Sequence, residues 1–313
     1  MLHLRVITPP DRTDKVVELL ERGTGVTNVV LLPSAARRPP GDVVLADVAR
    51  EAADDLIADL KNLGLADDGS IALEDIAVSI SRGAVEAEEK APGEGDDAVI
   101  WDQLAQKVVA DSRGTWAFLA FLAIATQIAA IGVLIPSQIL IVGAMVLGPE
   151  FGAVSAICFG LLTVRWALVG TAVRTLLAGF ATAVAVTFAC AFVSRGLGWV
   201  EPDMLRHNDE VHFIVMPDRW SFIVALLAGA AGVLSVTAGK SSALVGVFIS
   251  VTTVPAAGYM AVALALGRWP EVGGSALQLV VNIAGMVVAG TATLLVQRGL
   301  WRRYGPRLPA TRA

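Results

Sequence analysis

Glu150 is the one acidic residue inside the long apolar stretches of this sequence, and it directly follows Pro149. An ionised carboxylate at membrane depth is costly unless it is protonated, paired, hydrated or bound to a cation. Glu150 is therefore a candidate for holding a proton or a small cation. A structural role is the other interpretation, because Pro149 suits the first position of a helix and Glu150 the second, where free N–H groups stabilise a carboxylate. The two roles are compatible, since ion sites are also built at helix breaks.

Three further polar side chains lie inside apolar stretches and complete the candidate chemistry. Arg174 either extends back to the membrane surface or pairs with Glu150. Gln278 and Asn282 are four residues apart and share one face of a helix. They either form hydrogen bonds between helices or line a polar path together with Gln127, Thr252 and Thr253.

The segment around Glu150 resembles a later segment, since residues 140–152 align with residues 243–258 when a small gap is allowed before the second proline. A proline in a helix interior interrupts the hydrogen-bond ladder, and matched interruptions in two inverted halves are typical of a transporter's central site. The simpler interpretation is that both prolines only kink their helices. We predict a substrate or ion site built from both segments and their neighbours: Gly148, Pro149, Glu150, Arg174, Pro255, Gln278 and Asn282.

The elements that must position these residues are membrane-spanning helices. The chain has 313 residues, of which 55% are hydrophobic and 17% charged, and its mean hydropathy is +0.66. A purely soluble enzyme of this composition is very unusual. A span needs about 20 apolar residues, and six stretches are long enough: 115–135, 138–164, 166–194, 220–239, 242–267 and 273–297. We expect an all-α domain of six spans at 113–298, with two inverted three-helix repeats.

The charges predict how these spans are oriented. Basic residues gather near one set of span ends, which the positive-inside rule places in the cytosol. The longest loop between spans, 195–219, is acidic instead, which fits the outer side. No signal peptide is recognisable before the first strand. The expectation is a multi-pass protein of the cell inner (plasma) membrane with both termini cytoplasmic. The basic ends are marked by Arg113, Arg165, Lys240 and the arginines of a basic tail at 299–313.

Residues 1–82 differ from the rest in charge and in pattern. Residues 1–96 carry 10 Lys/Arg against 19 Asp/Glu, an acidity that argues against nucleic-acid binding. Short alternating strands and amphipathic helices occur in the order βαββαβ, which predicts an α+β, ferredoxin-like cytosolic domain. Residues 83–97 are rich in Gly, Pro and acidic residues and predict a flexible linker. Residues 98–112 predict an amphipathic helix at the membrane interface.

Motifs of enzymes and resident cofactors are missing from the sequence. It has no phosphate-binding glycine loop, no Ser/His/Asp order and no His-Glu-x-x-His helix, so we expect neither an enzyme nor a cofactor. Its two cysteines lie in apolar runs and read as small hydrophobic residues. His207 and His212 flank two acidic residues in the acidic loop; a metal cluster there is one hypothesis, and an ordinary hydrophilic loop is the other.

Residues 141–153, Ile-Val-Gly-Ala-Met-Val-Leu-Gly-Pro-Glu-Phe-Gly-Ala, resemble the signature of a bacterial and archaeal family of hydrophobic membrane proteins, domain of unknown function 389. Residues 244–258 and the Val-Asn-Ile-Ala around Asn282 resemble its second Gly/Pro segment and the Asn of its last span. The resemblance covers about residues 115–298, and many members carry a similar N-terminal domain. It implies a membrane protein of undetermined activity. Glu150 stands where the family usually has an apolar residue, so no role for this carboxylate is carried over.

These observations favour an ion or small-solute transporter or channel, whose cytosolic domain regulates it or drives assembly. A membrane-embedded ligand sensor and a scaffold are the alternatives. We expect a homo-oligomer. The two open edges of a four-stranded sheet can pair with another copy or close over a ligand, and a stripe of small residues along the second span allows close helix packing within or between subunits. The expected partners are the lipid bilayer and a small molecule or ion. The small-residue stripe consists of Gly148, Gly152, Ala156 and Gly160.

Overall fold

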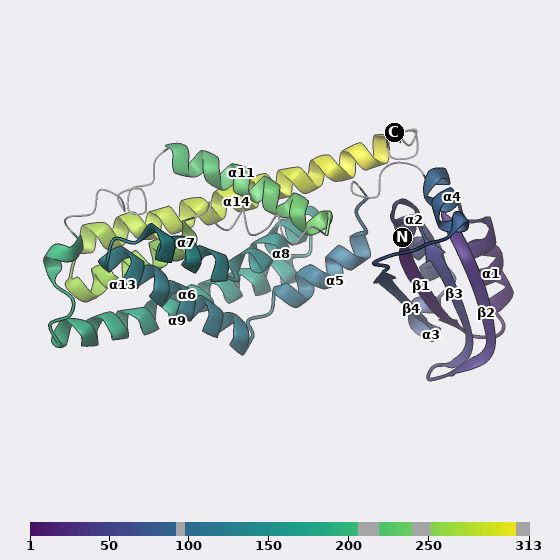
Figure 1. The fold of residues 1–313 in the computed structure, drawn as a ribbon, viewed down its shortest axis with the longest axis horizontal. Helices are drawn as coiled ribbons and strands as arrows, with labels where there is room; N and C mark the ends of the chain where they lie inside the picture. Colours follow the sequence, from purple (N-terminus) through teal and green to yellow (C-terminus); the bar gives the residue numbers. More distant parts are fainter. Residues whose placement is uncertain (92–97, 206–218, 240–251, 305–313) are drawn as a thin grey trace. The chain divides into compact units, whose positions relative to one another are not determined.

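The computed structural model describes residues 1–91, 98–205, 219–239 and 252–304. The chain divides into two compact units (Figure 1). One comprises Met1–Leu104 and Arg298–Ala313, and the other comprises Ala105–Gln297. The first contains a small antiparallel sheet with helices, and the second is helical.

The first unit is built on a four-stranded sheet in the order β2-β3-β1-β4, in which every neighbouring pair is antiparallel. Leu2, Leu4 and Val6 alternate with more exposed residues along β1 and are buried. They share one core with Val16 and Leu60 from the helices, as the period-two pattern of a half-buried strand requires. The elements are β1 (Leu2–Thr8), α1 (Thr13–Arg22), β2 (Val26–Arg37), β3 (Pro40–Val48), α2 (Arg50–Asn62), α3 (Leu65–Asp68), β4 (Ser70–Asp75) and α4 (Arg82–Lys90).

Helix α4 differs from the sequence-based expectation, because it occupies the first half of the segment assigned to a flexible linker. The Ser81 side chain caps it by accepting a hydrogen bond from the Ala84 backbone N–H. Ala84 and Ala87 are buried on its inner face, and the helix contacts β2. The acidic composition concealed this short apolar stripe. The remainder of the expected linker, residues 92–97, lies outside the described residues.

The second unit holds the apolar helices. Within the described residues, four helices are long and apolar enough to cross a membrane: α6 (Trp116–Leu134), α9 (Trp166–Gly196), α11 (Arg219–Thr237) and α14 (Trp269–Tyr304, apolar through Leu300). A fifth candidate is the pair α7 (Gln138–Leu147) and α8 (Glu150–Leu162), which bends by 50° at its break. The shorter apolar helix α13 (Thr253–Leu266) follows residues 240–251, which are not described. Helix α5 (Trp101–Asp111) precedes α6, and the short 3-10 turn η1 (Pro202–Leu205) follows α9.

The helices of the first half, α6 and α9, run in the same direction. Gly114, just before α6, lies beside Thr175, and Gly179 further along α9 lies beside Phe118 and Leu122. Helix α8 comes between α6 and α9 in the sequence. It packs antiparallel to the start of α9, with Gly160 against Val169.

The helices of the second half, α11 and α14, also run in the same direction as each other. Gly285 lies against Ala225, and further along both helices the Gln297 side chain donates to Thr237 Oγ1 at 3.0 Å. Helix α13 leads into α14 through a turn at Gly267, whose φ of 76° suits glycine. Figure 1 shows α9 and α14 running in opposite directions along the helical unit.

Candidate functional site

The break between α7 and α8 creates the candidate site. Gly148 leaves the helical conformation with ψ of 123°, Pro149 is the N-cap of α8, and Glu150 is its first residue. One interpretation of the sequence assigned Pro149 to the first helical position and Glu150 to the second; each assignment is wrong by one residue. At the N-cap, the missing N–H of Pro149 removes no helical hydrogen bond, because the first N–H groups of a helix have no partner within it. The carboxylate of Glu150 lies at the positive end of α8.

Glu150 is buried, with 6% of its surface exposed. Its Oε1 atom accepts a hydrogen bond of 2.5 Å from Thr253 Oγ1, at the first residue of α13. Its Oε2 atom has no hydrogen-bond partner within the part of the chain that the structure describes. A side chain at Gly148 would collide with this oxygen, so glycine keeps the space beside the carboxylate open. The first residues of α8 and α13 therefore meet through Glu150 and Thr253.

A second set of polar contacts adjoins the first at Thr252. Its Oγ1 atom accepts from Gln278 Nε2 at 3.2 Å and from Asn282 Nδ2 at 3.0 Å, both on α14. Gln278 is fully buried and Asn282 is 2% exposed. Because Thr252 and Thr253 are consecutive, the hydrogen bonds join three helices; we call this set the Glu150 cluster, and it consists of Glu150, Thr252, Thr253, Gln278 and Asn282.

Pro255 is buried at the third residue of α13. In the first turn a proline is tolerated, since its missing N–H would have had no partner within the helix. It thus lies at a helix start beside the Glu150 cluster and not in a helix interior. Residues 240–251, just before Thr252, lie outside the described residues.

Arg174 is the one predicted site residue that the structure does not bring to the cluster. It is exposed on α9, and the side chain that donates to the Glu150 carboxylate is that of Thr253. The pairing of Arg174 with Glu150, one of two interpretations from sequence, is therefore not observed. Gln127 is half-buried on α6 and makes no hydrogen bond to the cluster in the described residues. His207, His212 and their acidic neighbours fall outside the described residues.

Ser275 is a residue that the sequence analysis missed. It is fully buried on α14, and its Oγ has no partner among the described residues. The signal was present in the sequence, because Ser275, Gln278 and Asn282 are spaced by three and four residues and share one helix face.

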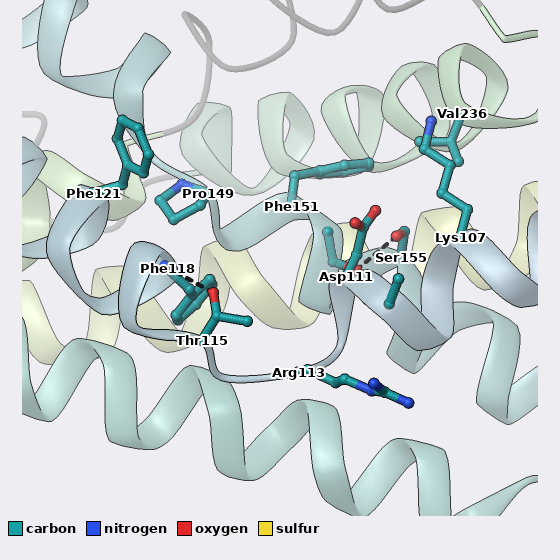
Figure 2. A pocket seen from close by; sticks show the side chains of 12 residues that line it. Lys107, Asp111, Arg113, Thr115, Phe118, Phe121, Pro149, Phe151, Ser155 and Val236 are labelled. Atoms are coloured by element: carbon teal, nitrogen blue, oxygen red, sulfur yellow. Dashed lines mark hydrogen bonds between the residues drawn. The ribbon is translucent and has the colours of Figure 1, made fainter.

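A cavity of about 450 Å³ lies beside the helix break (Figure 2). Pro149 and Phe151, the two neighbours of Glu150 in sequence, both line it. Asp111, at the end of α5, also lines it, and burial raises the pKa of this carboxyl group while the nearby Lys107 lowers it. The remaining lining residues are Ala110, Arg113, Thr115, Phe118, Phe121, Gly152, Ser155 and Val236.

The comparisons with known proteins concern the segment that carries this site. Residues 145–288 match the model of a family described as a domain of unknown function, DUF389. The match covers just under half of the chain, confirms the resemblance seen in the sequence and contains all seven predicted site residues.

An uncharacterised protein of Methanocaldococcus jannaschii is similar to the chain, with 28% identity over 137 residues. The match covers 44% of this chain and 40% of that protein, so it spans well under half of the relative's length. No solved structure matches the chain significantly. The DUF389 description and the relative's name state no activity, and the function has to be argued from the site.

Proposed function

We propose that this protein carries an ion or small solute across the cell inner (plasma) membrane through the Glu150 cluster. The observation that carries the proposal is the meeting of α8 and α13, whose first residues are joined by the Thr253–Glu150 hydrogen bond. Helix ends and irregular backbone occur at membrane depth where they are buried in protein or line a cavity. Paired helix starts with buried polar side chains are how several transporter folds form their binding sites.

The directions of the helices support two inverted repeats. Each half has two long helices that run in one direction, α6 and α9 in the first and α11 and α14 in the second. The bent pair α7/α8 lies between the first two in sequence, and α13 lies between the second two. The first pair runs opposite to the second pair. Such an arrangement follows when a three-span unit is duplicated, and it implies six crossings with α13 as the described part of the fifth. Six crossings would leave both chain termini on one side of the membrane, and the basic span ends favour the cytosol for that side.

The N-terminal unit fits a regulatory or assembly role and a ferredoxin-like fold. Its strand order β2-β3-β1-β4 with helices on one face is the arrangement expected from the βαββαβ pattern. Strands β2 and β4 are the edges and have unpaired backbone groups for a second copy or a ligand. We propose a homo-oligomer without enzymatic activity. The net charge of −5 argues against nucleic-acid partners.

The test is flux through proteoliposomes that contain the full chain, assayed with a panel of ions and small solutes. We expect wild type to conduct at least one of them and Glu150→Gln to reduce that flux by about tenfold or more. Arg174→Gln is the matched control, because it removes a charge from an apolar helix outside the cluster; its flux should stay within about twofold of wild type. In a Glu201→Cys variant, the exposed position 201 should be labelled from the outer side. This labelling shows how the protein is oriented in the vesicles.

Absence of flux across the whole panel, with all variants folded, would leave the membrane sensor or scaffold as the function. Equal loss of flux in Glu150→Gln and Arg174→Gln would remove the special role of the Glu150 cluster.

A further inference from the structure

The hydrogen bonds of the Glu150 cluster leave some of its buried acceptor oxygens without a donor among the described residues. The Thr253 hydroxyl is used on Glu150 Oε1, and the side-chain amide groups of Gln278 and Asn282 both donate to Thr252 Oγ1. Two buried oxygens, Glu150 Oε2 and Gln278 Oε1, have no partner among the residues that the structure describes. Buried acceptors without partners are costly, and one of these belongs to a group with a formal negative charge.

We propose that the Glu150 cluster binds one singly charged cation, held by Glu150 Oε2 and Gln278 Oε1. That this cation is the transported species rests on the proposed function, whereas the binding site itself does not. The single carboxylate balances one positive charge. A Ca²⁺ site normally uses six to eight oxygens with several carboxylates, and the described residues contain no group of three His, Cys, Asp or Glu side chains suited to a metal ion.

The two helix starts argue for reversible binding of a cation over binding of an anion. A helix N-terminus carries about half a positive charge and attracts negative groups. In this site Glu150 already supplies the negative group, so an external anion would meet a carboxylate and acceptor oxygens that have no donor among the described residues. The ends of α8 and α13 stabilise the ionised carboxylate after the cation leaves. A carrier needs such a balance, because its site must release what it binds.

A proton and an alkali cation would occupy this site in different ways. A proton on Glu150 Oε2 turns this unpartnered acceptor into a hydroxyl group and neutralises the carboxylate. A sodium or potassium ion is coordinated by both oxygens directly, and the Thr252 oxygen is close to the same amide. Both ions carry one positive charge and bind to oxygen atoms, and the two arms of the experiment distinguish between them.

The binding arm measures thermal unfolding of the full chain in detergent, in sodium, potassium or choline chloride at equal ionic strength. For an alkali cation we expect a rise in Tm of about 5 °C at a hundredfold excess over Kd. Glu150→Gln should abolish the rise, Glu150→Asp should keep part of it because the charge remains, and Arg174→Gln should keep all of it. The Glu150→Gln variant retains an oxygen that can accept from Thr253, so we expect its fold to be preserved, and circular dichroism checks this.

The proton arm measures acidification of vesicles with a trapped pH-sensitive dye after a pH gradient is applied. If the cation is a proton, Tm is the same in sodium and choline, and Glu150-dependent proton uptake appears. A folded Glu150→Gln variant that changes neither the Tm response nor proton uptake would overturn the cation site. A Glu150-dependent Tm rise in a protein that moves nothing would support the site while rejecting the transport function.

Discussion

At the scale of single residues, the Thr253 hydroxyl decides how Glu150 is held. It donates to the carboxylate from another helix at 2.5 Å, and Thr253 is 1% exposed. Removing a buried donor leaves its acceptor without compensation, and this penalty exceeds the net value of the bond itself. Thr253 is therefore where the contact between α8 and α13 can be tested with little change of volume.

Thr253→Val should lower the free energy of unfolding by about 1–2 kcal/mol, since valine keeps the shape and removes the hydroxyl. Thr171→Val is the matched control, because the exposed Thr171 hydroxyl only donates to Ala167 O in its own helix. The control should stay within about 0.5 kcal/mol of wild type. Unfolding of both variants in detergent, followed by circular dichroism, compares them; equal losses would mean that the Thr253–Glu150 bond does not hold the two helix starts together.

At the scale of helices, Gly258 sets the distance between α13 and α6. A Cβ atom at Gly258 would lie 2.9 Å from both Ala130 N and Thr126 O, which are backbone atoms of α6. Neither atom can move without moving the helix. A small residue at such a contact lets two helices pack closely in a membrane, and this packing fixes where α13 starts relative to Glu150.

Gly258→Ala should destabilise the protein by about 1–3 kcal/mol, because overpacking outweighs the higher helix propensity of alanine. Gly170→Ala is the control: Gly170 is also helical, on α9, but no atom lies within 4 Å of its Cβ position. There the propensity gain stands alone, so stability should be unchanged or rise by up to about 1 kcal/mol. Thermal melts in detergent should therefore show a lower Tm for Gly258→Ala and an equal or higher Tm for Gly170→Ala; an equal or higher Tm in both would show that the α6 contact yields easily.

Sequence patterns predicted the βαββαβ order of the first unit and the helix break, but not what each helix contacts. Alternating apolar residues indicated the strands, and Gly148-Pro149 marked the end of α7. Hydropathy could not distinguish one straight span from the bent pair α7 and α8, because both are continuously apolar. Glu150, Gln278 and Asn282 were predicted as one site, whereas Arg174 was included for its charge alone. Helical periodicity places a residue on its own helix, and only packing decides which neighbour that face meets.

At the scale of the whole molecule, the N-terminal unit extends further along the chain than its composition indicated. Ile100 belongs to the buried core of this unit. The Trp101 backbone N–H donates to Asp54 Oδ1 at 3.0 Å, and Arg50 Nε donates to Ala98 O at 3.3 Å. Burial raises the pKa of Asp54, and the bond from Trp101 opposes that shift. Residues 98–104 therefore complete the unit that the sequence ended at residue 82.

A fragment of residues 1–104 should accordingly be more stable than a fragment of residues 1–82. Loss of the Ile100 side chain from the core costs about 2–4 kcal/mol, and the shorter fragment also lacks α4 with its buried Ala84 and Ala87. Urea unfolding of both fragments measures the difference. Ile100→Ala in the longer fragment isolates the core contribution, since it keeps the backbone bonds to Asp54 and Arg50, and it should account for most of the loss. Equal urea midpoints for the two fragments would contradict a core that depends on Ile100, and would return the boundary of the unit to residue 82.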